Sequence, residues 1–327
     1  MDELTRKGLR RIARELVPIN DWRVHKRLNL YIDIGPHCNA DCGFCVAKTR
    51  DQKHRIRNLS RMLESSAAIR EYCYSVEFVG GEPLVYINNG LKELFEVFRA
   101  NRKKIITTNG LRQPFLASLD FLGEFEHVNI SRHAVDDAHN EQIFRTGKLL
   151  TLADIGALPP SLKQKIRMNT TCHADKGIHQ WSSMWEFIQA FNDQGIHQFM
   201  FANLNKLPQG QYQEEMEAFT TAHRLDDGFF DDVEHNLCRQ GYHKVREMTG
   251  FGYVVRILQN GSTSVVLKEN DDTAIRDVLD SVYQHNRMVL DLILTPSGKV
   301  YTDWFLTNEL PITPGPQQSG TAASIES

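Results

Sequence analysis

Three cysteines lie close together in the sequence, at Cys38, Cys42 and Cys45. They follow an apolar run, 28–34, that is typical of a buried strand. Three thiolates on one loop can bind three corners of an iron–sulfur cube, and this segment contains no fourth cysteine. A [4Fe–4S] cluster held in this way has one iron open to another molecule. The motif therefore predicts a cluster that takes part in chemistry, and not one that only relays electrons.

Two plainer interpretations of the cysteines stay open at this point. They could be buried core residues, or they could bind zinc with His37 as a fourth ligand. Structural zinc sites take four protein ligands, and catalytic zinc favours other ligand sets. A second motif further along the chain, Gly80-Gly81-Glu82-Pro83, speaks against zinc. Such a motif is expected beside a [4Fe–4S] cluster with an open iron, and not beside a zinc ion.

Strand and helix patterns alternate through the first two thirds of the chain. We expect strands over 28–34, 75–79, 104–107, 127–131, 165–171 and 197–202. We expect helices near 59–72, 89–101, 113–121 and 178–194. About six such β/α repeats indicate parallel strands joined by crossover helices. The sequence therefore predicts an α/β fold, a partial (β/α)6 barrel of the TIM type.

Polar or glycine-rich segments follow most of these predicted strands. They are the cysteine loop, 80–83, 107–110, 131–133 and 169–171. In parallel β/α barrels the active site lies at the C-terminal ends of the strands. We therefore expect these segments to meet at one end of the sheet and to form the site.

The β/α rhythm ends near residue 210. Asn260-Gly261 separates two alternating runs, which is a strong hairpin signal, and a second pair of runs covers 289–294 and 299–304. These predict an antiparallel extension over the open end of the barrel. We expect an N-terminal amphipathic helix and linker over 1–27, the barrel over 28–210, the capping extension over 211–310 and a disordered tail over 311–327.

Composition excludes several classes of protein. The 327 residues carry a net charge of −3, which gives no broad attraction to nucleic acid. No apolar run is long enough to span a bilayer, and no secretory signal precedes the first strand. The remaining cysteines, Cys73, Cys172 and Cys238, are too scattered for a disulfide framework. We predict a cytoplasmic protein that does not act at a membrane.

The two motifs together resemble the radical S-adenosylmethionine (SAM) superfamily. The spacing Cys-x3-Cys-x2-Cys, with Phe44 before the last cysteine, is its cluster motif, and Gly80–Pro83 follows the second predicted strand, where that superfamily has its GGEP element. Thr-Asn-Gly at 108–110 and Ser131 make the chain most similar to the subgroup of MoaA. A weaker local likeness, at 42–49, is to viperin.

The resemblance implies that SAM binds the open iron and is cleaved to a 5′-deoxyadenosyl radical. It implies cluster ligation by Cys38, Cys42 and Cys45. The implied SAM-binding residues are Phe44, Gly80, Gly81, Glu82, Pro83, Thr108, Asn109, Ser131, Asn169 and Asn203. Arg132 is a candidate partner for a carboxylate or phosphate, His133 a candidate proton donor, and Trp304 a candidate substrate contact.

The chain departs from MoaA-like relatives in its C-terminal part. Only Cys238 lies beyond residue 200, so we predict one cluster and no auxiliary cluster. The segment before the first predicted strand is too short for the leader-binding domain of many peptide-modifying members, so we expect a small-molecule substrate (nucleotide, nucleoside, sugar or amino acid). Without an auxiliary cluster to accept an electron, we expect a redox-neutral rearrangement, elimination, epimerisation or cyclisation. A flavodoxin or ferredoxin type of donor would supply the electron. A peptide-modifying radical SAM enzyme and a non-catalytic iron–sulfur protein for electron transfer or sensing are the alternatives.

Overall fold

The computed structural model describes residues 17–18, 22–23, 28–49, 52–207, 214–250, 253–271, 288–289, 291–302, 304, 306 and 308–312. The helix predicted within residues 1–27 and all but the first two residues of the predicted tail lie outside this part of the chain. Within it, no helix is both long enough and apolar enough to cross a membrane.

The chain builds one long sheet and a pair of short strands. The pair joins β1 (Val17–Pro18) to β11 (Met288–Val289). The strands of the long sheet are β2 (Leu28–Asp33), β3 (Cys73–Val79), β4 (Lys103–Thr108), β5 (His127–Ser131), β6 (Ile166–Cys172), β7 (Gln198–Asn203), β8 (His243–Gly250), β9 (Tyr253–Asn260), β10 (Thr263–Asn270), β12 (Leu292–Leu294), β13 (Val300–Tyr301) and β14 (Glu309–Leu310). Each of the six strands predicted for the β/α region is confirmed, with small shifts of its ends.

Helices connect the parallel strands. They are η2 (Val46–Thr49), α2 (Gln52–Arg55), α3 (Leu59–Ile69), η3 (Arg70–Tyr72), η4 (Pro83–Tyr86), η5 (Ile87–Leu91), α4 (Lys92–Val97), α5 (Arg112–Leu116), α6 (Leu119–Leu122), α7 (Asp137–Phe144), α8 (Leu152–Gly156), α9 (Pro160–Lys163), α10 (Trp181–Asp193), α11 (Glu214–His223) and α12 (Phe229–Arg239). The helix expected near 89 begins at Lys92 instead, because Gly90 has a φ of 101° and breaks the helical path.

The order of strands in the long sheet is β14-β13-β12-β2-β3-β4-β5-β6-β7-β10-β9-β8. From β12 through β10 each neighbouring pair is parallel. The predicted hairpin β9–β10 is confirmed, but β10 also pairs with β7 in parallel, and β12 pairs with β2 in the same way. The C-terminal segment thus extends both edges of the sheet, which the sequence patterns did not indicate.

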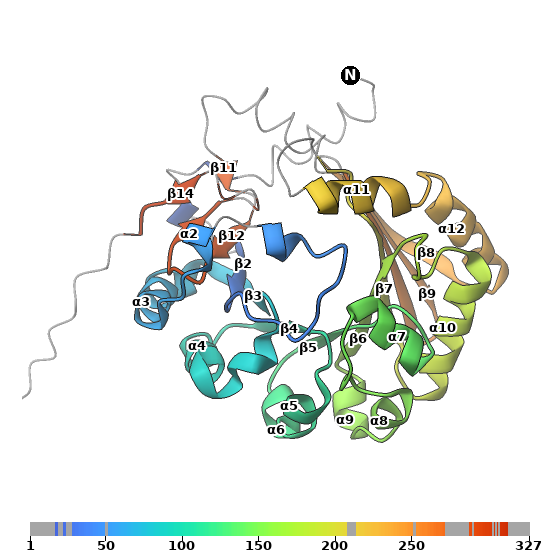
Figure 1. Cartoon of the computed structure of the whole chain (residues 1–327), viewed down its shortest axis with the longest axis horizontal. Helices are drawn as coiled ribbons and strands as arrows, with labels where there is room; N and C mark the ends of the chain where they lie inside the picture. The colour runs from blue at the N-terminus through green and yellow to red at the C-terminus, as the bar shows by residue number, and fades with distance from the viewer. Residues whose placement is uncertain are drawn as a thin grey trace, which may run out of the picture.

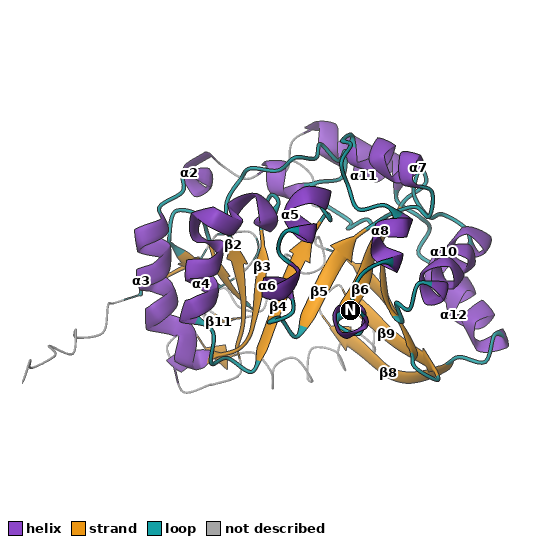
Figure 2. Cartoon of the chain, turned by 90° about the horizontal axis from the view of Figure 1, so that it is seen from below, coloured by secondary structure: helices purple, strands orange, loops and turns teal. Residues whose placement is uncertain are grey.

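The sheet curves, with helices α3, α4, α5, α6 and α10 on its convex side (Figures 1 and 2). Its hydrogen-bonded order ends at β14 on one side and at β8 on the other, so the pairing of the described strands does not close into a ring. The fold is a mixed α/β fold with a largely parallel sheet. The cysteine loop, drawn in blue after β2, crosses the concave side (Figure 1).

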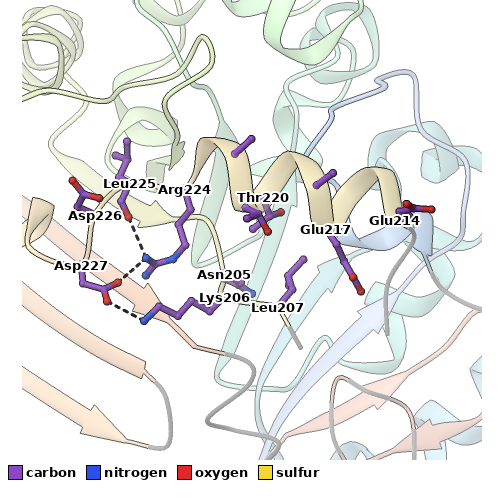
Figure 3. A pocket seen from close by; sticks show the side chains of 13 residues that line it. Asn205, Lys206, Leu207, Glu214, Glu217, Thr220, Arg224, Leu225, Asp226 and Asp227 are labelled. Atoms are coloured by element: carbon purple, nitrogen blue, oxygen red, sulfur yellow. Dashed lines mark hydrogen bonds and ion pairs between the residues drawn. The ribbon is translucent and has the colours of Figure 1, made fainter. Parts of the chain in front are cut away.

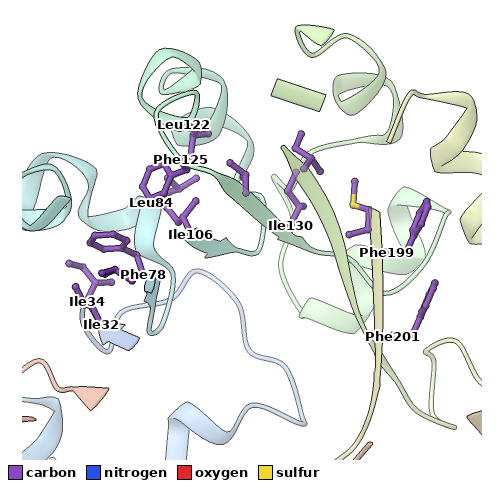
Figure 4. Close-up of a cluster of buried hydrophobic side chains, with 14 of the residues drawn as sticks. Ile32, Ile34, Phe78, Leu84, Ile106, Leu122, Phe125, Ile130, Phe199 and Phe201 are labelled. Atoms are coloured by element: carbon purple, nitrogen blue, oxygen red, sulfur yellow. The ribbon is translucent and has the colours of Figure 1, made fainter. Parts of the chain in front are cut away.

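The main core lies between the convex face of the sheet and the helices. Phe78 and Ile106 are register partners on β3 and β4, and both are fully buried. Figure 4 shows them beside Phe125, whose ring lies 5.8 Å from that of Phe78. Because side chains alternate between the two faces of a strand, the residues between these core positions line the concave face.

Candidate active site

The cysteine loop joins β2 to η2 and brings the three predicted cluster ligands together. Cys42 is buried, Cys45 is partly buried and Cys38 is exposed. Burial raises the pKa of Cys42 to about 12, and the charges of Cys45 and Cys38 add to this rise. The Cys42 thiolate is therefore destabilised by its burial and by its neighbours until a cation binds among them.

Three thiol groups on one loop are a donor set that fits three corners of an iron–sulfur cluster. No group of three His, Cys, Asp or Glu side chains in the described part of the chain is arranged to hold a single metal ion. A cube, by contrast, distributes its thiolate ligands over separate iron atoms and so needs a wider spacing. Cys38, Cys42 and Cys45 would hold such a cluster, and the structure assigns none of these sulfurs to a disulfide.

The Gly80–Pro83 turn is hydrogen bonded to the beginning of the cysteine loop. The Gly81 amide donates to the carbonyl of Gly35 and the Glu82 amide donates to that of His37, each at 2.9 Å. A Cβ atom on Gly81 would lie 2.2 Å from the His37 carbonyl oxygen. Glycine at this position is thus required by close backbone approach.

Glu82 holds the ends of two strands together. Its side chain is fully buried and accepts hydrogen bonds from the Leu84 amide at 3.0 Å, the Thr108 hydroxyl at 2.6 Å and the Asn109 amide at 2.7 Å. Pro83 is buried and begins η4. Both carboxylate oxygens are engaged by the protein itself, so Glu82 and Thr108 position the site and do not present free groups to a cofactor.

Burial gives Glu82 a pH-dependent effect on stability. Desolvation raises its pKa from 4.5 to about 7, against three hydrogen bonds that lower it. Because the folded pKa is the higher one, this contribution to stability is complete below about pH 4.5 and is lost as pH rises through about 7. We expect the free energy of unfolding to fall across this window by up to about 1.4 kcal/mol per pH unit. Urea titrations between about pH 4.5 and pH 7 should show this fall in the free energy of unfolding in the wild type and not in Glu82→Gln. The same pH dependence of unfolding in both proteins would contradict the prediction.

Asn109, Ser131 and Asn169 lie around the same end of the sheet. The Asn109 side-chain amide donates to Asn39 at 2.8 Å and lies 3.7 Å from the Cys38 sulfur. Ser131 and Asn169 are register partners at the ends of β5 and β6. The side-chain oxygens of Asn109 and Asn169 are buried without a hydrogen-bond partner within the described structure. Buried acceptors of this kind favour a bound donor group.

Comparison with known proteins agrees with this geometry. The profile of the Radical SAM superfamily matches residues 32–150, which include the cysteine loop and the Gly80–Pro83 turn. We therefore assign this matched region, residues 32–150, to the radical SAM superfamily. It is 26% identical over 177 residues to the "Probable GTP 3′,8-cyclase" of Aeropyrum pernix, a match that covers 51% of this chain and 48% of that relative. The chain thus spans about half the length of this relative.

Two solved structures share the fold of this radical SAM chain. Streptococcus suis SuiB bound to S-adenosylmethionine aligns with a TM-score of 0.50 at 17% identity, over 70% of this chain and 52% of SuiB. Native anSMEcpe with bound AdoMet and Cp18Cys peptide aligns with a TM-score of 0.50 at 15% identity, over 86% of this chain and 75% of that one.

Phe44 lies within an aromatic group at the edge of the radical SAM motif. Its ring centroid is 5.1 Å from that of His133, 5.3 Å from His173 and 6.4 Å from Phe219. Both ring nitrogens of His173 are buried without a partner in the described part of the chain. Sequence reasoning missed His173 and Phe219, because the contact joins the segment directly after β6 and helix α11 to a loop far away in the sequence.

Two predicted roles need correction. Asn203 faces the convex side, where its amide donates to the Leu225 carbonyl at 2.9 Å and accepts from the Leu225 amide at 3.1 Å. Arg132 is 1% exposed and uses its guanidinium for the carbonyls of Ala134, Val135 and Leu150 and for the Asp137 carboxylate at 2.6 Å. Neither side chain is free to meet SAM or a substrate, so both are structural.

His133 and Trp304 differ in how well their positions suit the predicted roles. Burial lowers the pKa of His133 to about 3, and its Nδ1 accepts a hydrogen bond from the Thr171 amide. The imidazole is therefore neutral at pH 7 and cannot act as an imidazolium acid. Trp304 is 40% exposed, and its ring lies 4.8 Å from that of Tyr31 at the concave face. A substrate contact for Trp304 stays a prediction.

The contrast between Asn203 and Asn169 gives a direct test. We expect Asn203→Ala to lower the free energy of unfolding by about 1–3 kcal/mol, because it leaves the buried Leu225 amide and carbonyl without partners. Asn169→Ala removes an acceptor that has no partner among the described residues and should instead weaken SAM binding about tenfold. Chemical unfolding and anaerobic calorimetry with SAM measure the two quantities. Loss of SAM affinity in Asn203→Ala with unchanged stability would restore its original assignment.

A cavity of about 950 Å³ lies beside α11, at the end of β7 (Figure 3). Arg224 and Lys206 line it, and both bind the carboxylate of Asp227, at 2.6 and 2.9 Å. Its two basic groups are thus neutralised by the chain itself. Among the predicted site residues, none contributes to the described lining of this cavity.

Proposed function

We propose that this chain uses a single [4Fe–4S] cluster, bound by Cys38, Cys42 and Cys45, to cleave S-adenosylmethionine reductively. When bound and reduced, the cluster supplies one electron to the sulfonium of SAM, and the S–C5′ bond breaks to give methionine and a 5′-deoxyadenosyl radical. That radical takes a hydrogen atom from a substrate C–H bond. The main support is the cysteine loop, which is hydrogen bonded to the Gly80–Pro83 turn at the C-terminal ends of parallel strands.

The residues of the chain hold SAM and shield it in this proposal. Gly80 and Gly81 would contribute backbone atoms to the methionine end, while the missing side chains make room for Asp33 and for the His37 carbonyl of the cysteine loop. Glu82 fixes that backbone. Asn109, Ser131 and Asn169 offer polar atoms at the strand ends, and Phe44 provides an aromatic surface for the adenine. The curved sheet would act as a partial (β/α)6 barrel of the TIM type, with the cofactors at its C-terminal end.

We infer a small-molecule substrate and an external one-electron donor of the flavodoxin or ferredoxin type. The similarity to a relative named for a GTP cyclase supports a small molecule. The names of the structures with similar folds mention peptides, so a peptide-modifying enzyme is the second candidate. The division of the chain at residues 27, 210 and 310 and the count of one cluster are likewise proposals.

The decisive experiment is anaerobic. The reconstituted protein is incubated with SAM and dithionite, and 5′-deoxyadenosine is measured by mass spectrometry. We expect its formation together with iron and sulfide in the chain. A protein that holds zinc, or that holds a cluster but releases no 5′-deoxyadenosine, would overturn the proposal.

A further inference from the structure

The concave face of the sheet carries a row of polar side chains below the strand ends. We call Tyr31, Glu77, Thr107, Asn129 and Arg167 the inner band. Register pairs Tyr31 with Glu77, Thr107 with Asn129, and Asn129 with Arg167, so the band crosses five adjacent strands, β2 to β6. The interiors of β/α barrels are usually filled by bulky branched apolar residues. The acidic Glu77 and the basic Arg167 are therefore unexpected on this concave face.

Asn129 separates the acid from the base. The side-chain Nδ2 of Asn129 donates to Glu77 Oε1 at 3.3 Å and to the Thr107 hydroxyl at 2.9 Å. Its side-chain Oδ1 accepts from Arg167 Nε at 3.1 Å. Thr107 also donates to Glu77 Oε1 at 2.6 Å. The inner band thus binds one carboxylate oxygen of Glu77 and one guanidinium nitrogen of Arg167. Among the described residues no hydrogen bond reaches Glu77 Oε2 or the two terminal nitrogens of Arg167.

The two charges attract each other without forming an ion pair. The field of Glu77 raises the pKa of Arg167, although burial lowers it more. The salt bridges of the described chain do not include a contact between these two residues, which are both partly buried. Partly buried charges are costly unless they are paired. The unpaired atoms of Glu77 and Arg167 therefore suit a ligand that brings one group of each sign.

The band lies directly below the proposed SAM site. Arg167 and Asn169 are two residues apart on the same face of β6, a separation of about 7 Å along the strand. Further from the strand ends, Asn29 accepts from Ser75 at 2.6 Å and lies 3.5 Å from Asp291, so polar side chains cover the face there. A ligand held by the band would consequently lie between these residues and the SAM radical.

We propose that the inner band binds the head group of a free amino acid, with the carboxylate on Arg167 and the ammonium on Glu77. A forked guanidinium matches a carboxylate through two parallel hydrogen bonds. A phosphate monoester suits the band less well, because its larger negative charge would face Glu77. The inference rests on the proposed function, since the amino acid would be the substrate of the radical. Of the substrate classes considered above (nucleotide, nucleoside, sugar and amino acid), this inference selects the amino acids.

The test measures binding and not turnover. The cluster-loaded protein is saturated with SAM and kept without reductant, so that the methionine position is filled and no radical forms. The probes are the standard L-amino acids other than methionine, one at a time, with acetate, methylammonium and inorganic phosphate at matched ionic strength. Ligand-detected NMR and calorimetry report the affinities. We expect at least one amino acid to bind at least about tenfold more tightly than each single-charge probe.

Variants of the band give the expected signature. Arg167→Met should weaken amino-acid binding at least about tenfold. Glu77→Gln keeps the acceptor for Thr107 and Asn129, so it should lose the amino acid while it binds acetate as well as the wild type or better. Arg112→Met is the control, because Arg112 pairs with Asp154 on the helical side, at 2.7 Å. If Arg167→Met does not fold, Arg167→Lys takes its place and should also lose affinity.

Several outcomes would overturn the inference. They are the binding of no amino acid, tighter binding of phosphate than of any amino acid, and unchanged amino-acid affinity in the Glu77 and Arg167 variants. Release of 5′-deoxyadenosine by the wild type with SAM and dithionite is measured in parallel. Its presence with a failed binding test removes only the amino-acid inference, whereas its absence removes the proposed function.

Discussion

Replacement of Cys42 by alanine is expected to abolish cluster binding and the release of 5′-deoxyadenosine. Wild-type protein, reconstituted without oxygen, should contain about four irons and four sulfides per chain. Cys42 is the most deeply buried of the three cysteines, and it packs with Phe144 and Leu149. Without its thiolate only two corners of a cube would be held. Iron and sulfide analysis, the visible absorption spectrum and the 5′-deoxyadenosine assay measure the effect.

Cys73 provides a matched control for this experiment. It is 7% exposed, and Cys42 is 9% exposed. The pKa of Cys73 is also raised to about 12, but by burial alone and without neighbouring thiolates. Its sulfur donates to the Ile69 carbonyl and to no other group in the described part of the chain. Cys73→Ala should therefore keep the cluster and the activity. Equal loss of iron in both variants would mean that Cys42 acts through packing and not as a ligand.

The sequence predicted the strands well because their signal is local. Each strand of the β/α region alternates core-facing and concave-facing residues, and the Asn260-Gly261 turn identifies its hairpin without any distant information. Pairing between distant segments has no such signal. For this reason the parallel pairing of β10 with β7 and of β12 with β2 could not be predicted from the sequence.

The residues of the site likewise divide into those with a local sequence signal and those whose position depends on distant segments. Cysteine spacing and the glycine pair predicted the motif loops, because both constraints are encoded in adjacent residues. Asn203 was assigned wrongly because its face depends on register: Ala202, one residue earlier, points to the concave side beside Thr171, and Asn203 points away from it. Arg132 was assigned wrongly because its partners lie in a connection, near Leu150, whose path the sequence pattern does not determine.

These corrections change how the site is expected to work. The charged groups available to a ligand are not at the strand ends, where Glu82 and Arg132 are engaged by the protein, but lower on the concave face at Glu77 and Arg167. The strand ends instead fix the positions of the two motif loops. Their contribution is geometric, which means that steric changes between the loops should affect activity strongly.

Gly81→Ala is expected to show this geometric effect. The new Cβ would lie 2.2 Å from the oxygen and 2.6 Å from the carbon of the His37 carbonyl, which are backbone atoms that cannot rotate away. The residues before Cys38 must then move away from the Gly80–Pro83 turn. Overpacking of this kind costs about 1–3 kcal/mol, and a displacement of about 1 Å in a catalytic arrangement can reduce a rate about 10²-fold. We expect both effects, measured by chemical unfolding and by the 5′-deoxyadenosine assay.

Gly147→Ala is the control for this substitution. The atoms nearest to its Cβ would be those of the Glu141 carboxyl group, at 3.6 Å or more, which is ordinary van der Waals contact. This variant should match the wild type in rate and be equally stable or more stable by up to about 1 kcal/mol, since alanine restricts the unfolded chain. If Gly81→Ala kept the wild-type rate and cluster content, the close approach of the two loops would not matter for the chemistry. A fall in rate for Gly81→Ala alone would instead trace the activity to that approach.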